Sequence, residues 1–266
     1  MGPALARVTG CCGRGSQGHL KEQVYIDPRP AEHFDRYHRR VRERGPDWMY
    51  PFCRMILTPP MLLLYRARAI ATEHVPERGP VILAPNHFSN LDHFFLGVFL
   101  RRQVQFMAKS QLFTFPIDFI LSHGGTFPVR RGQHDEQAFV TAHAILDQGG
   151  VIGMYAEGGR SRSKRLGKPK PGLGKLALES GVPVVPVAIH GSEHARDWRL
   201  PKVTIQYGEA LQFDRVPEPT REQSDHASQK VFEGVRDMYE ALHANGRRGV
   251  LRSLRRSRRH GAPVTG

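Results

Sequence analysis

Two residues whose types suit proton transfer, His87 and Asp92, stand five positions apart in a short polar stretch between two apolar runs. The run before them, residues 81–83, is typical of a buried strand, and the run after them, residues 94–100, of an apolar helix. An imidazole titrates near neutral pH, and a carboxylate partner fixes its tautomer and raises its basicity. The pattern therefore predicts an oriented general base in a strand-to-helix turn.

The same stretch is also typical of a helix cap. Ser89, followed three residues later by Asp92 and then by an apolar run, matches a capping box. On this interpretation Ser89 is the N-cap, Asp92 lies near the third helical position, and His87 is a loop residue only. Residues five apart on an ideal helix point about 140° away from each other. His87 and Asp92 can therefore meet only if the helix begins between them, where the cap signal falls, so the two interpretations are compatible.

Strand and helix patterns alternate along most of the chain. We expect strands over residues 81–83, 104–108, 125–129, 151–155, 184–189 and 203–207, and helices over 31–44, 135–148, 173–180 and 221–245. Thr220 and Gln223 form a second capping box, at the start of the last helix. The alternation predicts a single α/β domain with a mixed, mainly parallel sheet flanked by helices. Polar groups repeatedly follow a strand, which is where open α/β sheets bind their ligands.

Arginines and glycines follow two of these strands. Arg130 and Arg131 end one strand, and Arg160 stands in a Gly-Gly-Arg-Ser turn after another. The planar guanidinium matches the geometry of phosphate, and glycines let backbone N–H groups approach the same anion. Combined with the base at His87, these residues indicate transfer to a hydroxyl group of a phosphorylated substrate.

The chain is strongly basic, with a net charge of +14 over 266 residues. Half of that charge comes from seven arginines in residues 246–266, a segment without acidic residues. Such a charge favours an alternative from another class, a non-catalytic module that binds nucleic acid or an anionic surface. Anionic lipid headgroups explain the charge as well as nucleic acid does. A binding module does not need the motifs around His87 and Glu157, so we expect a membrane surface as partner and no nucleic acid.

Other classes are not supported by the sequence. Three cysteines cannot form a disulfide framework, and the first residues lack a secretory signal, so a reducing compartment is expected. No hydrolase, dinucleotide or P-loop motif is present. His190 and His194 have the spacing of two metal ligands, but Gly191 disfavours a helix there and no third ligand is evident, so we expect no metal. The most apolar stretch, residues 55–65, is interrupted by Pro59-Pro60 and is too short to cross a bilayer, although it can lie on one.

Four motifs occur in order between residues 81 and 207. They are Asn86-His87-x4-Asp92, Thr126-Phe127-Pro128-Val129-Arg130, Tyr155-Ala156-Glu157-Gly158-Gly159-Arg160-Ser161 and Val182-Pro183-Val184-Val185-Pro186-Val187. In these motifs the sequence resembles the 1-acylglycerol-3-phosphate acyltransferase (PlsC-like) family. Met107-Ala108-Lys109 and Lys170-Pro171-Gly172 also stand where that family often has lysine. Ala156 and Gly159 depart from the proline and threonine that the family usually has, which bears on the acceptor more than on the chemistry.

The resemblance implies a glycerolipid acyltransferase fold and a role for each matched residue. His87 is the catalytic base and Asp92 supports its imidazole. The implied substrate-binding residues are Asn86, Lys109, Arg130, Glu157, Gly158, Gly159, Arg160, Ser161 and Pro186. The implied reaction moves an acyl chain from acyl-CoA or acyl carrier protein to lysophosphatidic acid, without an acyl-enzyme and without a cofactor. Another lysophospholipid or a glycolipid is the alternative acceptor.

Four regions are expected along the chain. Residues 1–45 are a polar, partly disordered extension, with disorder over 1–18, and residues 46–75 form an amphipathic membrane-facing segment. A helix packed on its own domain would have the same composition as residues 46–75. Residues 76–245 form the acyltransferase domain, and residues 246–266 are an Arg-rich disordered tail, in which Leu251 and Leu254 also suit a small basic amphipathic segment. We expect a peripheral protein at the cytoplasmic face of the membrane, without a transmembrane span.

Overall fold

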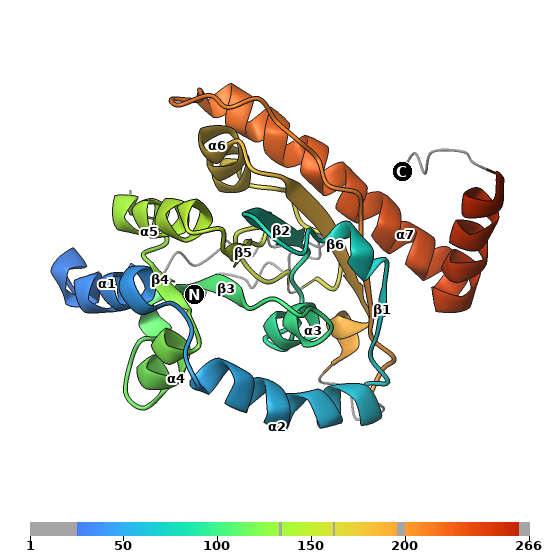
Figure 1. Ribbon diagram of the computed structural model, residues 1–266, viewed down its shortest axis with the longest axis horizontal. Helices are drawn as coiled ribbons and strands as arrows, with labels where there is room; N and C mark the ends of the chain where they lie inside the picture. The colour runs from blue at the N-terminus through green and yellow to red at the C-terminus, as the bar shows by residue number, and fades with distance from the viewer. Residues whose placement is uncertain (1–25, 133–134, 162, 196–199, 261–266) are drawn as a thin grey trace, which may run out of the picture.

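The strands of the computed structural model, which describes residues 26–132, 135–161, 163–195 and 200–260, form one seven-stranded sheet (Figure 1). The strands are β1 (Arg68–Ile70), β2 (Val81–Pro85), β3 (Val104–Lys109), β4 (Phe127–Val129), β5 (Val151–Gly153), β6 (Val184–His190) and β7 (Thr204–Tyr207). Their order in the sheet is β1-β7-β6-β2-β5-β3-β4. Every pair is parallel except β6 with β7, which confirms the predicted α/β class with a mixed, mainly parallel sheet.

Helices cover both faces of the sheet. They are α1 (Asp35–Arg44), α2 (Met49–Leu63), α3 (Asp92–Val98), α4 (Ile117–His123), α5 (Glu136–Asp147), α6 (Pro171–Ser180) and α7 (Arg221–His260). Alternate residues of β2 serve the two faces: Ile82 and Ala84 pack with α5, α6 and α7, whereas Val81 and Leu83 pack with α2 and α3. Because both faces of β2 are buried, its sequence is a continuous run of apolar residues.

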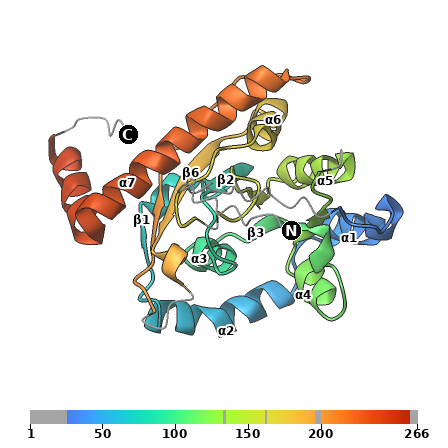
Figure 2. The same cartoon turned by 180° about the vertical axis from the view of Figure 1, so that it is seen from behind.

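Helices α6 and α7 approach each other at Gly174. A Cβ atom at this position would lie 2.0 Å from the carbonyl oxygen of Ser224. The backbone N–H of Gly174 donates to the Ser228 hydroxyl at 2.7 Å. The predicted capping box at the start of α7 is confirmed, since Thr220 and Gln223 exchange hydrogen bonds of 2.8 and 3.2 Å. The long first half of α7 is therefore anchored against α6, and both helices lie on the same face of the sheet (Figures 1 and 2).

Helix α2 lies along the face opposite α7 and runs through both prolines that were expected to interrupt it. Proline removes one N–H donor and fixes φ near −65°, which is a helical value. The ladder resumes at once, because Leu64 N–H donates to the Pro60 carbonyl at 2.9 Å. None of the helices within the described residues is long and apolar enough to cross a membrane.

The C-terminal segment corrects one prediction. Gly246 has φ 61° and ψ 172°, which ends the first half of α7, but the chain then continues as a helix to His260. The disorder predicted for residues 246–266 is therefore wrong as far as His260, because apolar residues of this segment pack on the domain. Residues 1–18, also predicted to be disordered, lie outside the described residues, whereas the charged helix predicted over 31–44 is present as a 3-10 turn followed by α1.

Candidate active site

His87 and Asp92 are in contact at the carboxyl end of β2. His87 Nδ1 lies 2.9 Å from Asp92 Oδ2, and the two residues are 5% and 0% exposed. Because an ionised carboxylate only accepts hydrogen bonds, we assign the proton to Nδ1, which leaves Nε2 as the basic nitrogen. The geometry is that of a general base held by a buried acceptor.

The start of α3 makes this contact possible. The helix begins at Asp92 itself, so Asp92 is its first residue and not its third as the capping box predicted. Asp92 Oδ2 also accepts from the backbone N–H groups of Phe88 and Ser89, each at 2.8 Å. One carboxylate oxygen therefore closes the turn and orients the imidazole, while the Ser89 hydroxyl accepts from Leu91 N–H at 3.2 Å.

Glu157 fastens the loop after β5 to the loop after β2. Its Oε1 accepts from the backbone N–H of His87 at 2.9 Å, and its Oε2 accepts from Gly167 N–H at 2.8 Å. Ser161 adds a second link, because its backbone N–H donates to the His87 carbonyl at 2.9 Å. Both carboxylate oxygens of Glu157 thus accept from backbone N–H groups, and one of them fixes the backbone of His87.

Aromatic rings surround the imidazole. Tyr155 stacks on His87 with ring centroids 3.9 Å apart and planes inclined by 21°. His93 meets both rings edge-on, and Phe106 lies behind His93 and Tyr155. Burial lowers the pKa of His93 to about 4, so its imidazole is neutral near pH 7. The sequence did not predict the contacts of Tyr155 and His93 with His87. Tyr155 follows β5, which pairs with β2, and this pairing brings it next to His87.

Cationic and glycine residues follow the neighbouring strands. Lys109 is the exposed last residue of β3, and Arg130 follows β4 with its backbone N–H bonded to Asp135 Oδ2 at 2.6 Å. Arg131, which was not among the predicted site residues, lies nearer the loop after β5: a Cβ at Gly159 would lie 3.3 Å from its guanidinium. Arg160 is exposed. Positive charge thus follows the carboxyl ends of β3, β4 and β5, at the edge of the parallel sheet where β2 is followed by His87.

Gly158 needs to be glycine for two reasons. Its φ of 66° is in the left-handed region, and a Cβ would lie 2.8 Å from the side chain of Lys170. The loop that follows is closed by the Ser161 hydroxyl, which donates to the Arg165 carbonyl at 2.5 Å. Gly158 and Ser161 therefore shape the loop that faces the base.

Two predicted substrate-binding residues have other partners. Asn86 is fully buried, and its amide exchanges hydrogen bonds of 2.7 and 3.0 Å with the backbone of Ile189. It therefore extends the pairing of β2 with β6 beyond the last strand residue. Pro186 lies inside β6, where its ring packs beneath Gly208 and Gly234, and so it stands apart from the cluster around His87.

Glu157 gives the site a pH-dependent contribution to stability. Burial raises the pKa of its carboxyl from 4.5 to about 7, against the opposing effect of its two backbone N–H donors. Between these two pKa values the folded chain holds a proton that the unfolded chain has released. The free energy of unfolding is therefore expected to fall by roughly 3 kcal/mol as pH rises through this window, and by no more at higher pH.

The measurement is urea unfolding of the wild type and Glu157→Gln between pH 4 and pH 8. Other titrating groups cancel in the difference between the two proteins, and glutamine does not titrate. As pH rises, the unfolding free energy of the wild type is expected to fall relative to that of Glu157→Gln. A difference that stays constant with pH would contradict the raised pKa.

A model of the family described as Acyltransferase matches residues 66–190. The chain is 29% identical over 168 residues to the 1-acyl-sn-glycerol-3-phosphate acyltransferase BAT2, chloroplastic, of Brassica napus, covering 60% of this chain and 45% of that protein. It is 25% identical over 198 residues to the 1-acyl-sn-glycerol-3-phosphate acyltransferase of Bacillus subtilis, covering 73% of this chain and 98% of that protein. The chain thus spans less than half of the plant relative and nearly all of the bacterial one.

Among solved structures, the chain resembles the 1-acyl-sn-glycerophosphate (LPA) acyltransferase PlsC from Thermotoga maritima. The TM-score is 0.56 at 19% identity, and the match covers 80% of this chain and 97% of that one. At this identity the likeness concerns the fold. The family match includes His87, Asp92, Arg130 and Glu157, whose arrangement is described above. Over residues 66–190 the chain is therefore similar to the Acyltransferase family, and its fold resembles that of PlsC.

Proposed function

We propose that this protein transfers a fatty acyl chain from an acyl thioester to the free hydroxyl of 1-acylglycerol-3-phosphate, giving phosphatidic acid. The observation that carries the proposal is the buried hydrogen bond of 2.9 Å between His87 Nδ1 and Asp92 Oδ2, at the edge of the sheet where cationic residues follow β3, β4 and β5. A single oriented base next to phosphate-binding groups suits attack by a hydroxyl on a phosphorylated acceptor.

In the proposed reaction His87 Nε2 removes the proton of the acceptor hydroxyl as its oxygen attacks the thioester carbonyl. The new C–O bond forms, the C–S bond breaks, and the thiolate leaving group takes the proton back from Nε2. Asp92 stabilises the imidazolium that exists between these steps. No covalent acyl-enzyme is formed, and we propose no cofactor or metal, since the two substrates carry both reacting groups.

The phosphate of the acceptor is proposed to bind at the strand edge that holds Lys109, Arg130, Arg131 and Arg160. A guanidinium group binds phosphate through two parallel, charge-assisted hydrogen bonds, which are strong and fix its orientation. Gly159 stands beside Arg131 where the family usually has threonine, so a hydroxyl that could contact the acceptor is missing there. The second candidate acceptor is another lysophospholipid or a glycolipid.

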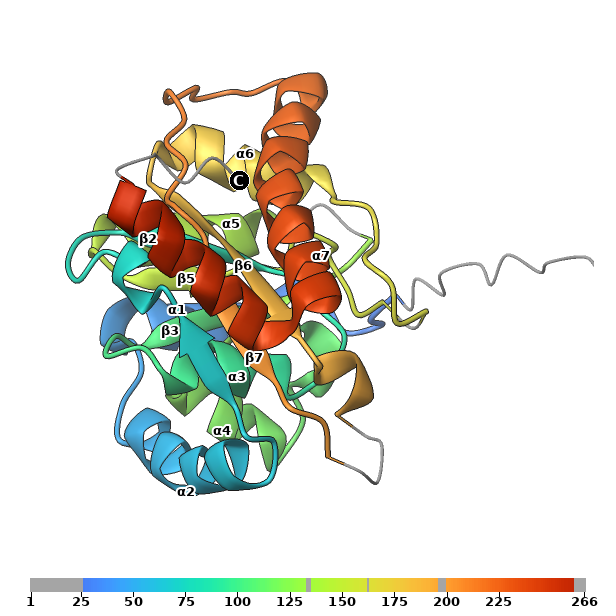
Figure 3. The same cartoon turned by 90° about the vertical axis from the view of Figure 1, so that its right-hand side faces the viewer.

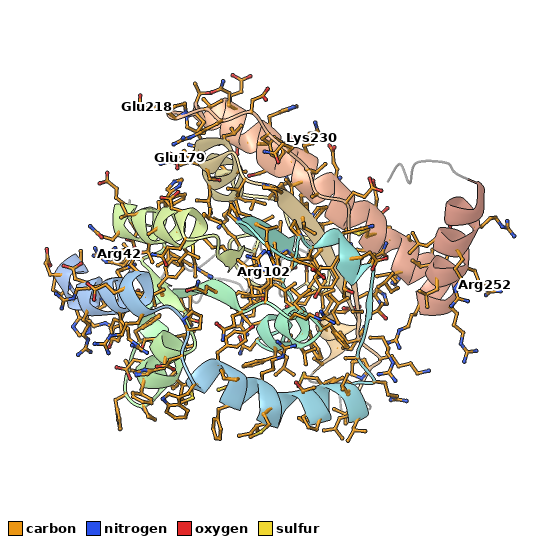
Figure 4. The ribbon with its side chains drawn as sticks, in the orientation of Figure 1. Arg42, Arg102, Glu179, Glu218, Lys230 and Arg252 are labelled. Atoms are coloured by element: carbon orange, nitrogen blue, oxygen red, sulfur yellow. The ribbon has the colours of Figure 1, made fainter. Side chains whose placement is uncertain are left out.

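Membrane contact is proposed to be peripheral, on the cytoplasmic face, through α2 and the region of α4. The large apolar side chains left exposed there are Trp48, Phe52, Met55, Ile56, Leu63, Leu64, Leu112, Phe115, Ile117, Phe119 and Ile120. The two helices are linked by Asp47 N–H, which donates to the His123 carbonyl at 3.0 Å. Side chains of α2 project away from the sheet (Figure 4). Contiguous apolar surface of this kind marks an interaction site.

The test is release of free thiol from acyl-CoA, with lysophosphatidic acid present or omitted, and with acyl carrier protein as a second donor. Release that depends on lysophosphatidic acid supports the proposal and identifies the donor. Release only with another lysolipid keeps the acyl transfer and changes the acceptor. Absence of acceptor-dependent release with either donor would refute the enzyme and favour the basic surface as the functional feature.

A further inference from the structure

The helix after Gly246 is fastened to the edge of the sheet by one arginine. The Arg247 guanidinium donates to the Thr204 hydroxyl and the Val203 carbonyl, both at 2.9 Å, and to the Arg66 carbonyl at 3.0 Å. Val250, Leu251 and Leu254 of the same helix pack with Leu242 of the first half of α7 and with Ile70 of β1. Figure 3 shows this helix lying across the side of the molecule that carries β1.

The side of this helix next to the packed one carries exposed arginines. Arg248, Arg252 and Arg255 are exposed, and Arg66 and Arg68 are exposed on the chain that enters β1. We call these five residues the basic strip. Within the described part of the chain, no carboxylate forms an ion pair with any of them. Five guanidinium groups that lack acidic partners attract a polyanion.

The basic strip continues from the apolar surface of α2. Leu63 and Leu64, which end this helix, are 76% and 50% exposed and stand two or three residues before Arg66. In Figures 1 and 3 the end of α2 and the helix after Gly246 flank β1 on the same side of the molecule. Apolar side chains bordered by arginines match the order of a membrane surface, where acyl chains are bordered by charged headgroups.

We propose that the basic strip binds anionic lipid headgroups of the membrane on which α2 rests. The proposal rests on the membrane contact of the proposed function and adds the lipid class that it recognises. Nucleic acid lacks the acyl layer that Leu63 and Leu64 would enter, so an anionic lipid surface accounts for both parts of this surface. The helix after Gly246 is then a headgroup-binding element and not a passive tail.

The experiment is sedimentation of the full chain with vesicles, either of phosphatidylcholine alone or of phosphatidylcholine mixed with phosphatidylglycerol. The strip variant carries Arg248→Gln, Arg252→Gln and Arg255→Gln. The control variant carries Arg221→Gln, Lys230→Gln and Arg236→Gln, which removes the same charge from exposed positions of the first half of α7. Figure 4 places Lys230 on the first half of α7 and Arg252 on the helix after Gly246. Melting temperatures verify that both variants are folded.

The strip variant is expected to bind mixed vesicles about 100-fold more weakly than the wild type. Each basic residue near an anionic surface contributes about 1 kcal/mol, which is about fivefold in binding. The control variant is expected to bind as the wild type does, and added salt should abolish the difference by screening. On phosphatidylcholine alone the three proteins should bind alike.

Equal binding of the strip and control variants to mixed vesicles would overturn the proposal. So would a strip variant that keeps vesicle binding but loses binding to acyl carrier protein, because the partner would then be an acidic protein. Sedimentation requires no turnover. A chain that binds anionic vesicles through the strip but transfers no acyl group would therefore refute the proposed function and leave this inference intact.

Discussion

Replacing His87 with alanine is expected to lower acceptor-dependent thiol release by about 10²–10⁴-fold. The loss follows from the removal of the nitrogen that accepts the proton of the attacking hydroxyl. Asp92 cannot substitute, because its Oδ2 is held by two backbone N–H groups and its side chain is completely buried. The measurement is the steady-state rate with acyl-CoA and lysophosphatidic acid for the wild type and His87→Ala.

A matched control is His143→Ala. His143 is bonded to Glu179 at 3.0 Å between α5 and α6, on another part of the domain. This variant is expected to keep wild-type turnover, which separates the loss of the base from a general effect of removing a histidine. If His87→Ala retained wild-type turnover while remaining folded, His87 would be the loop residue of the capping interpretation and the proposed mechanism would fail.

Asp92→Ala is expected to lower the free energy of unfolding by roughly 3 kcal/mol or more. It is also expected to abolish most of the activity. In the wild type His87 Nδ1 and the N–H groups of Phe88 and Ser89 lie 2.8–2.9 Å from Asp92 Oδ2. The substitution removes this shared acceptor. Buried donors without acceptors each cost about 1–3 kcal/mol. The measurement is denaturant unfolding combined with thiol release.

Asp92→Asn separates the charge of this residue from its hydrogen bonds. The amide oxygen can still accept from the turn, so stability should fall much less than in Asp92→Ala. Turnover should nevertheless fall by about 10²-fold, because a neutral amide does not stabilise the imidazolium. Wild-type turnover in Asp92→Asn would show that Asp92 only shapes the turn and leaves His87 as an unassisted base.

The two carboxylates near His87 thus act in different ways. Asp92 holds the side chain of His87, whereas Glu157 holds its backbone N–H. Asp92 lies in the polar turn itself and accepts three hydrogen bonds through one oxygen. Glu157 is supplied by a different strand, and burial raises the pKa of its carboxyl to about 7. The position of His87 therefore depends on two separate loops.

The sequence alone determined the features that depend on neighbouring residues. The apolar runs predicted most strands, the capping box of Thr220 and Gln223 predicted the start of α7, and the five-residue spacing of His87 and Asp92 predicted their contact. Such signals are short-range: a cap or a turn is decided by groups a few residues apart. For the same reason the four motifs were sufficient to indicate the family.

Only the tertiary structure decided which distant segments meet. It joins Glu157 to His87, stacks Tyr155 on the imidazole and places Asn86 on the backbone of Ile189. Each of these contacts depends on the order of strands in the sheet, which no local pattern encodes. The helix after Gly246 was predicted to be disordered for a similar reason. Its arginines predict a solvated segment, and only burial of Val250 and the contacts of Arg247 with the residues that lead into β1 and β7 make it part of the fold.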